Sequence, residues 1–241
     1  MRTATELTVA RAWTQLLQLE DGALADMTSG RITRVDPKAK TVTFVRLLGH
    51  GVLVGPEWAI ERGEGLSDDE LADLQVLLEL TADHNSRPVG SAVLSYADVP
   101  IEGLPDVRTV DDQAAVAALE GLCTPEDIEE VGLGGMPSRW VLLDDSPEVR
   151  AGSNGHLAGA GYVVWADVLA HLGVLTCPDK RRHGHGTVAA ALATNAALAA
   201  GLLPQWRARA DNEASQRVAA RLGFQPLGSQ TTVTIDRRAK H

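Results

Sequence analysis

A glycine-containing segment in the second half of the chain combines residue types that bind anions. Val174 to Thr176 ends an apolar strand pattern, Pro178 bends the chain, and Gly184 and Gly186 lead into an alanine-rich helix. Glycine lets a backbone turn and approach a ligand closely, and the unpaired amides and dipole of a helix N-terminus attract phosphate. This spacing therefore predicts a phosphate-binding loop.

Basic side chains and histidines accompany the two glycines. The loop contains Lys180, Arg181, Arg182, His183, His185 and Thr187. Because the whole chain has a formal net charge of -10, this basic run is a local exception. Cationic groups beside a helix N-terminus favour phosphate or ribose contact, with a solvated basic turn as the alternative. The histidine pair has no third ligand nearby, so we expect backbone donation to the ligand and no metal site.

Three classes of phosphate ligand bind at glycine loops of this kind. A nucleoside-triphosphate loop places lysine after its last glycine, where this chain has Thr187. The dinucleotide fingerprint is met by Gly184-x-Gly186-x-x-Ala189, but a proline and several charged residues separate the first glycine from the strand. The third class is the pyrophosphate of coenzyme A.

Two motifs resemble the GNAT superfamily of acetyl-CoA-dependent N-acetyltransferases. The first is Val174-x-Thr176-x-Pro178 followed by Arg181-x-x-Gly184-x-Gly186. The second is Pro204-x-Trp206, then Asn212-x-x-Ser215-x-x-Val218-Ala219-x-x-Leu222-Gly223-Phe224. The motifs stand in the family's order and separation, and the resemblance covers Leu157 to Pro226.

The resemblance implies that acetyl-CoA is the acyl donor and that no metal takes part. In this family the pantetheine arm lies along a strand and bonds to its backbone as an added strand would. This implies cofactor contacts from Val174, Leu175 and Thr176, which also fit an ordinary sheet core. The resemblance further implies that the amides from Arg182 to Thr187 hold the pyrophosphate, and that Asn212 and Ser215 contact the cofactor.

Acetyl transfer to an amine needs a base that removes a proton from the ammonium group. Many members of the family place Glu five residues before the Thr of the strand motif, where this chain has His171. Strand alternation puts His171, Gly173 and Leu175 on one face, so the imidazole can face the acyl chain if that face lines the cleft. His171 is the expected base and Asp167 the alternative, while an ordinary strand histidine is the competing interpretation.

The expected general acid is absent from its usual position. Many members carry Tyr where this chain has Ala219. A thiol with a pKa near 8.5 is a tolerable leaving group, so water or Ser215 could supply its proton. Asn212 has a second interpretation as a helix N-cap. The missing acid and the replaced Glu also allow an alternative function, a non-catalytic acyl-CoA-binding protein.

Composition limits the remaining classes. The chain has 241 residues, 44% of them hydrophobic, which is enough for one large or two small domains. Its acidic balance predicts no nucleic-acid partner and no membrane binding. Two cysteines and a charged first segment, Met1 to Glu20, predict no disulfide framework and no signal peptide, so we expect a cytoplasmic protein. The predominance of arginine among 22 basic residues is typical of a GC-rich bacterial genome.

The element pattern predicts an α/β fold with a mixed sheet. The resemblance implies that this is a GNAT-like fold with an additional N-terminal α/β region. In the first half we expect helices at 5–19 and 68–81 and strands at 41–48 and 51–54. In the second half we expect helices at 111–122 and from Thr124, and then strands, helices and strands in the order β-β-β-α-β-α-β. The elements of that series are 139–143, 157–165, 170–176, 187–200, 205–210, 212–222 and 231–235.

A turn-rich break from Pro100 to Asp106 predicts a boundary between residues 1–105 and a GNAT domain at 106–241. The first region exceeds what that domain needs. We expect it to be a degenerate copy of the fold, a unit through which the chain forms a homodimer, or a wall of the acceptor pocket.

Overall fold

The computed structural model describes residues 3–25, 30–144 and 155–236, and these residues form two compact units. The first unit comprises Met1–Ser95, Arg207–Arg217 and Gln225–His241, and the second comprises Tyr96–Trp206 and Val218–Phe224. The predicted boundary near Asp106 lies in a coil between Tyr96 and Arg108. The predicted division into two domains there stays a prediction.

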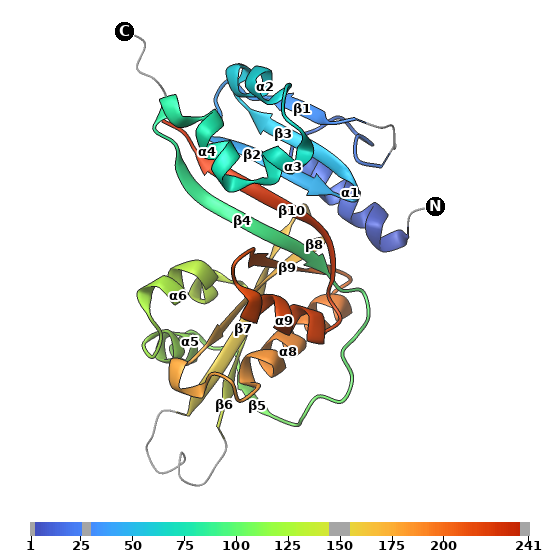
Figure 1. Ribbon diagram of the computed structural model, residues 1–241. Coiled ribbons are helices and arrows are strands. Elements are labelled where there is room, and N and C mark those ends of the chain that lie inside the picture. The colour runs from blue at the N-terminus through green and yellow to red at the C-terminus, as the bar shows by residue number, and fades with distance from the viewer. Residues whose placement is uncertain (1–2, 26–29, 145–154, 237–241) are drawn as a thin grey trace. The chain divides into compact units, whose positions relative to one another are not determined.

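The first unit is built on a mixed sheet in the order β1-β3-β2-β10-β4 (Figure 1). Its strands are β1 (Ile32–Val35), β2 (Thr41–Leu47), β3 (His50–Gly55), β4 (Arg87–Tyr96) and β10 (Gln225–Thr234). β2 pairs antiparallel with β3 and with β10, and β1 pairs parallel with β3. The predictions for β2, β3 and β10 are confirmed, whereas β1 and β4 were not expected from the sequence.

Helices α2, α3 and α4 cover one face of this sheet. The helices of the unit are α1 (Ala4–Leu16), α2 (Glu57–Gly63), α3 (Asp68–Ala72), α4 (Leu74–Leu80) and the 3-10 turn η1 (Ala82–His84). Apolar side chains of both layers form one buried cluster, which includes Val42, Phe44 and Leu71. The single helix expected over 68–81 is wrong: Asp73 is extended (ψ 125), and its carboxylate accepts a hydrogen bond from the Gln75 amide to begin a new helix.

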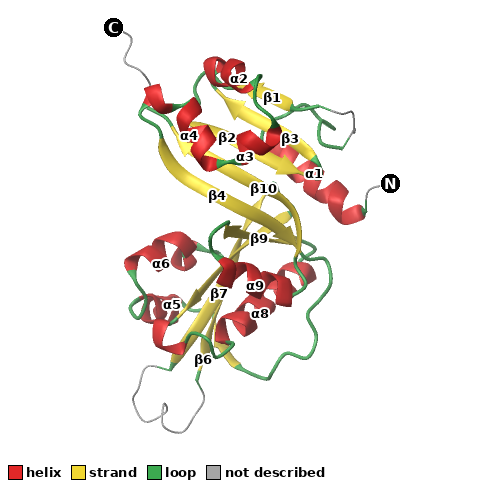
Figure 2. Cartoon of the chain, in the orientation of Figure 1, coloured by secondary structure: helices red, strands yellow, loops and turns green. Residues whose placement is uncertain are grey.

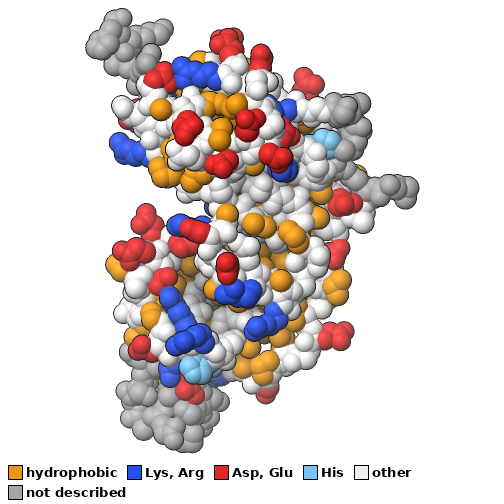
Figure 3. Space-filling view, viewed as in Figure 1, with side chains coloured by type: hydrophobic (Ala, Val, Ile, Leu, Met, Phe, Trp, Pro, Cys, Tyr) orange, Lys and Arg blue, Asp and Glu red, His pale blue; other side chains and the backbone are white. Residues whose placement is uncertain are grey.

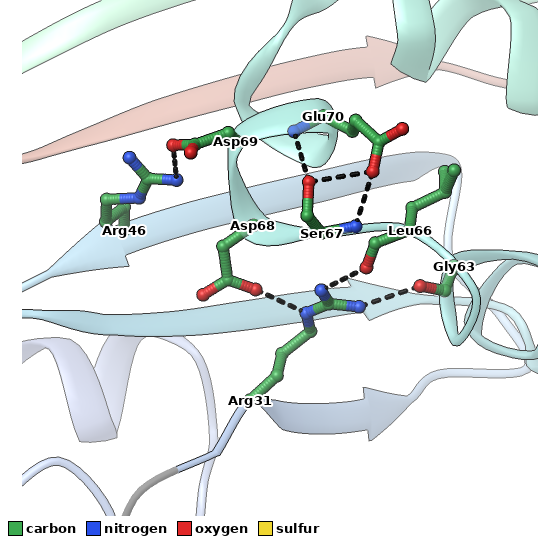
Figure 4. A network of polar contacts seen from close by, with 8 residues as sticks. All are labelled: Arg31, Arg46, Gly63, Leu66, Ser67, Asp68, Asp69 and Glu70. Atoms are coloured by element: carbon green, nitrogen blue, oxygen red, sulfur yellow. Dashed lines mark hydrogen bonds and ion pairs between the residues drawn. The ribbon is translucent and has the colours of Figure 1, made fainter.

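The start of α3 is held by a closed polar network, shown in Figure 4. The Ser67 hydroxyl accepts from the Glu70 amide, and the Glu70 carboxylate accepts from the Ser67 amide and hydroxyl. This confirms the predicted capping box. The Arg31 guanidinium donates to the Asp68 carboxylate and to two backbone carbonyls in the turn before the helix.

The second unit contains a sheet in the order β9-β8-β7-β6-β5. Its strands are β5 (Arg108–Val110), β6 (Ser138–Leu143), β7 (His156–Trp165), β8 (Leu169–Thr176) and the first part of β9 (Leu203–Arg209). Neighbouring strands are antiparallel except β8 and β9, which are parallel. The antiparallel pairing expected for β6 and β7 is confirmed, and so is the β-β-β-α-β-α-β order.

Helices lie on both faces of this second sheet (Figure 2). They are α5 (Gln113–Glu120), α6 (Pro125–Val131), α8 (His185–Ala199), the end of α9 (Glu213–Arg221) and the 3-10 turns η2 (Leu133–Gly135) and η3 (Pro178–Lys180). A Cβ on Gly186 of α8 would meet Thr176 and Val174, and one on the intervening Gly173 would meet Met136 and Val131. Because side chains alternate along a strand, α8 and the α6–η2 segment pack on opposite faces of β8.

The described residues contain no helix that is both long enough and apolar enough to cross a membrane. The longest, α8, has 15 residues, including Thr187, Thr194 and Asn195. Its Asn195 side chain accepts from the Ile101 amide and donates to the Ile101 carbonyl, both at 2.8 Å. Those two hydrogen bonds tie the coil that contains the predicted boundary to α8.

Candidate functional site

The loop before α8 turns by using residues with positive φ. Arg182 has φ 67 and Gly184, the N-cap, has φ 85. A left-handed conformation is free for glycine but costs a side-chain-bearing residue about 1 kcal/mol or more. Within the described residues no side chain caps α8, and its first turn contains no acidic residue. The backbone amides of this turn can therefore donate hydrogen bonds to a ligand, and the positive end of the helix dipole favours a ligand that is an anion.

Gly186 brings the first turn of α8 onto the end of β8. A Cβ at this position would lie 2.5 Å from the Thr176 hydroxyl oxygen and 3.7 Å from Val174. Any larger residue would push the helix start and the strand end apart. Thr176 and Val174 thus lie directly beneath the loop. Phosphate binding by this loop stays a prediction.

The pairing of β8 with β9 stops halfway along β8. Its parallel register joins Leu169 to Leu203, Ala170 to Pro204 and His171 to Gln205, and it ends there. On its other side, β8 pairs with β7 along its whole length. Among the described residues, the stretch from Leu172 to Thr176 therefore has a strand neighbour on one side only. An extended chain can add to such an edge through backbone hydrogen bonds.

Leu175 has a different role from its two neighbours in the strand. Its side chain is 2% exposed and packs in a buried apolar cluster with Met136 and Leu133. The side chain is therefore core, and any ligand contact from Leu175 would come from its backbone. Gly173 faces the same cluster, so the predicted common face of Gly173 and Leu175 is confirmed.

The arginines of the loop are exposed, and one of them is already paired. Arg181 forms a 2.7 Å ion pair with Asp127 of α6 while its side chain stays 48% exposed. The pKa of Asp127 is lowered chiefly by a hydrogen bond from Thr124 and then by Arg181. Arg182 is exposed. On the face shown in Figure 3, Lys and Arg side chains gather with a histidine over the second unit, as a site for an anion requires.

The two loop histidines stack on one another. Their ring centroids are 6.0 Å apart, and His183 donates from Nδ1 to the Arg181 carbonyl at 2.8 Å. Burial lowers the pKa of His185, with smaller contributions from His183 and Lys180. The fold therefore favours the neutral form of His185. Among the described residues, His, Cys, Asp and Glu side chains do not gather in any group of three that could hold a metal.

His171 sits in an environment that the sequence did not predict. Its imidazole stacks on Trp165, with centroids 3.9 Å apart and planes 12° apart. Its Nδ1 lies 3.3 Å from the Oε1 atom of Gln205, and the Nε2 atom of Gln205 donates to the Tyr96 hydroxyl at 2.9 Å. The β8–β9 register brings His171 and Gln205 together, and Tyr96 is added by the unexpected strand β4. Strand alternation gave no signal for this cluster, because its residues come from separate segments.

Asp167, the alternative base, lies in the tight turn between β7 and β8. Ala166 and Asp167 have φ 48 and 59, the positive sign that a type I′ turn requires at both central positions, and the Val168 amide donates to the Trp165 carbonyl at 3.2 Å. The Asp167 side chain is exposed. Its presence there is explained by turn geometry, since Asp tolerates the left-handed conformation better than most residues.

Asn212 and Ser215 belong to the first unit. The Asn212 Oδ1 atom accepts from the Ser215 amide at 3.0 Å, so Asn212 caps α9. Ala219, at the position where many relatives carry Tyr, is buried and offers no proton. Cofactor contact by Asn212 and Ser215 stays a prediction.

Residues 56–224, more than half of the chain, match the model of the acetyltransferase (GNAT) family. No curated protein matches the chain. Among solved structures, it is similar to a GCN5-related N-acetyltransferase-like protein from Streptococcus suis 89/1591, with 17% identity over 96% of this chain and 98% of that one, and a TM-score of 0.47.

Two further solved structures cover a smaller part of the chain. A GCN5-related N-acetyltransferase from Kribbella flavida is 23% identical over 69% of this chain and 64% of its own, with a TM-score of 0.45. An acetyltransferase from the GNAT family of Novosphingobium aromaticivorans DSM 12444 is 19% identical over 63% of this chain and 68% of its own, with a TM-score of 0.47. The chain thus spans about two thirds of the length of these two proteins.

Proposed function

Because this chain belongs to the acetyltransferase (GNAT) family, we propose that it transfers an acetyl group from acetyl-CoA to a primary amine. The acceptor is a small molecule or a protein amine. Transfer takes place by direct attack within a ternary complex. Its family makes the chain a transferase. The identity of the donor, the class of acceptor and the roles of the residues named below are our proposal.

The observation that carries the donor assignment is the uncapped start of α8 on the unpaired end of β8. The loop amides from Arg182 to Thr187 hold the pyrophosphate, where the helix dipole favours negative charge. The backbone from Val174 to Thr176, which β9 leaves unpaired, bonds to the pantetheine arm. Arg181 contacts a phosphate, either while it keeps its exposed ion pair with Asp127 or after that weak pair breaks.

His171 acts as the base in this proposal. Neutral imidazole takes a proton from the acceptor ammonium, and the amine nitrogen then forms a bond to the thioester carbonyl carbon. The carbon–sulfur bond breaks, the electron pair leaves on sulfur, and the new amide nitrogen loses its second proton to water. Because a thiol has a pKa near 8.5, the thiolate is a stable enough leaving group to take its proton from water.

A second candidate function is acyl-CoA binding without transfer. Ala219 is a buried methyl group at the position of the usual acid, and His171 replaces the usual Glu, so the chain lacks both familiar proton-transfer groups. A mass-spectrometric screen of an amine panel with acetyl-CoA separates the two functions. Transfer predicts an amine that gains one acetyl group, and pure binding predicts thermal stabilisation by acetyl-CoA with no acetylated amine.

The base is tested by His171→Gln, which keeps size and polarity but cannot accept a proton at neutral pH. We expect kcat to fall about a hundredfold or more and the KM for acetyl-CoA to stay within about twofold. The matched control is His84→Gln, since His84 also stacks on a tryptophan, Trp58, with centroids 3.7 Å apart. Turnover of His171→Gln within about threefold of the unmodified protein would refute this base.

A further inference from the structure

A buried glutamine and tyrosine stand behind His171. The Gln205 side chain belongs to a residue with 0% exposure, and Tyr96 is 2% exposed. Burying an amide costs free energy unless its polar atoms find partners, so a glutamine at such a position needs a reason. Here both ends of the amide are used, one by His171 and one by Tyr96.

The direction of these two hydrogen bonds indicates which nitrogen of the imidazole carries the hydrogen. The amide Nε2 atom of Gln205 donates to the Tyr96 hydroxyl, which turns Oε1 toward His171. A carbonyl oxygen only accepts, so the hydrogen in the 3.3 Å contact must be carried by Nδ1 of His171. In neutral imidazole the other nitrogen, Nε2, then holds the lone pair.

The plane of the ring is restrained separately. Trp165 stacks on the imidazole at 3.9 Å, and this contact fixes the ring plane without choosing between the two nitrogens. Trp165, Gln205 and Tyr96 all lie within the second unit, and the Gln205 amide is the one that contacts a ring nitrogen, Nδ1, so it can favour one nitrogen over the other as the carrier of the hydrogen.

We propose that Gln205, oriented by Tyr96, is a positioning residue that selects the Nδ1–H tautomer of His171 and so makes Nε2 the proton-accepting atom. The inference rests on the proposed function, in which His171 is the base. It adds two buried residues that act through His171. When the ring takes a second proton, the Gln205 oxygen still accepts from Nδ1, so the contact persists through proton transfer.

The first test observes the tautomer without any substrate. Nitrogen NMR of the full chain labelled at histidine distinguishes Nδ1–H from Nε2–H, and the His171 signals are those lost in His171→Gln. We expect the Nδ1–H form in the unmodified protein and a mixture of both forms in Gln205→Met, which keeps the volume but removes the acceptor. An Nε2–H form in the unmodified protein, or an unchanged signal in Gln205→Met, would overturn the proposal.

The second test is kinetic. Loss of a group that orients a functional histidine typically costs about 10- to 100-fold, so Gln205→Met should lower kcat by that factor while the KM for acetyl-CoA stays within about twofold. Tyr96→Phe keeps Gln205 but lets its amide rotate, and we expect a smaller loss together with a partial tautomer shift. Tyr96→Phe also serves if Gln205→Met fails to fold, since an unchanged tautomer there would equally count against the proposal.

The matched control is Gln230→Met on β10, where the glutamine side chain donates to the Thr232 hydroxyl at 3.2 Å. It should leave both the tautomer and kcat unchanged. The two hypotheses fail in different ways. If His171→Gln abolishes turnover but the tautomer ignores Gln205 and Tyr96, the positioning role alone is wrong. If the tautomer follows Gln205 but His171→Gln keeps its turnover, the base assignment in the proposed function is wrong.

Discussion

The N-termini of α3 and α8 satisfy the same backbone requirement in opposite ways. At α3 the chain supplies its own acceptors: the Ser67 hydroxyl and Glu70 carboxylate close a capping box, and the first turn contains three acidic residues. At α8 a glycine occupies the cap, and no acidic residue stands in the first turn. The positive end of the α3 dipole is thus neutralised from within, whereas that of α8 awaits an external anion.

The arginines beside the two helices differ in the same way. Arg31 is 16% exposed and donates to Asp68 and to the carbonyls of Gly63 and Leu66, so its donors serve the fold. Arg181 is 48% exposed, pairs with the carboxylate of Asp127 and makes a longer contact of 3.5 Å from Nε to the Thr176 carbonyl. A closed polar network at a helix start thus indicates a contribution to stability, while an uncapped helix start with accessible cations indicates a binding site.

The largest expected effect is the loss of coenzyme A binding in Gly186→Val. A Cβ at Gly186 would lie 2.5 Å from the Thr176 hydroxyl oxygen, and the branched side chain would cover the amides of the first turn. We expect affinity to fall at least about 100-fold, or about 2.7 kcal/mol, with native far-ultraviolet circular dichroism. Isothermal titration calorimetry with coenzyme A measures the change in affinity.

The matched control for this change is Gly65→Val, in the turn before α3. A Cβ at Gly65 meets nothing within 4 Å. The same substitution near the capped helix should therefore leave coenzyme A affinity unchanged. Equal affinity in both variants would remove the loop from the proposed donor site.

A second effect separates the two arginines. Arg31→Gln removes a partly buried charge-assisted contact with Asp68 and strands two carbonyls, so the free energy of unfolding should fall by about 2 kcal/mol. Arg181→Gln breaks an exposed ion pair and should change stability by less than about 1 kcal/mol, yet weaken coenzyme A binding several-fold. Urea unfolding and calorimetry on both variants test this crossed pattern, and the reverse assignment of effects would contradict the comparison.

Helix starts and turns could be predicted from the sequence, because each depends on residues that are close together in the chain. The capping box at Ser67, the proline start of α6 at Thr124 and the glycine loop before α8 each depend on residues a few positions apart, and each is confirmed. The helix expected over 68–81 shows the limit. Its leucines keep helical spacing through Asp73, but the aspartate caps a new helix instead of continuing the old one.

Contacts between residues far apart in the chain could not be predicted from the sequence. Strand β4 contains Pro88 and Gly90, which weaken any local strand pattern, and its pairing partners lie far away in the chain. The contact between Tyr96 and Gln205 joins residues 109 positions apart. The cluster around His171 therefore needed the structure, whereas the loop that precedes α8 did not.

A smaller effect concerns the cap of α3. Ser67→Ala removes the acceptor of the Glu70 amide and the donor to its carboxylate, so the free energy of unfolding should fall by about 1 kcal/mol. Coenzyme A affinity should not change. Ser67→Asp, which restores an acceptor at the cap, is the matched control and should recover most of the loss. A Ser67→Ala variant as stable as the unmodified protein would show that the network in Figure 4 adds nothing to the fold.

The smallest expected effect is a difference in how the starts of α3 and α8 make the free energy of unfolding depend on pH. Hydrogen bonds from the Ser67 backbone and hydroxyl lower the pKa of Glu70 below 4.5, so its contribution is complete above that pH and is lost as the pH falls through the folded value. Burial lowers the pKa of His185 below 6.5. The fold therefore disfavours the charged imidazole, and stability falls as the pH drops from 6.5 toward the folded pKa.

As the pH falls from about 7.5 to about 5.5, then, the His185 imidazole takes up a proton more readily in the unfolded chain than in the folded protein, while Glu70 stays ionised. His185→Gln should flatten the loss of stability in this window, and Glu70→Gln should not. A bound pyrophosphate would attract the protonated ring and raise the pKa of His185, so coenzyme A affinity should increase as the pH falls, opposite in sign to the stability of the free protein. Calorimetry at the two pH values tests this, and an affinity independent of pH in this window would place the pyrophosphate away from His185.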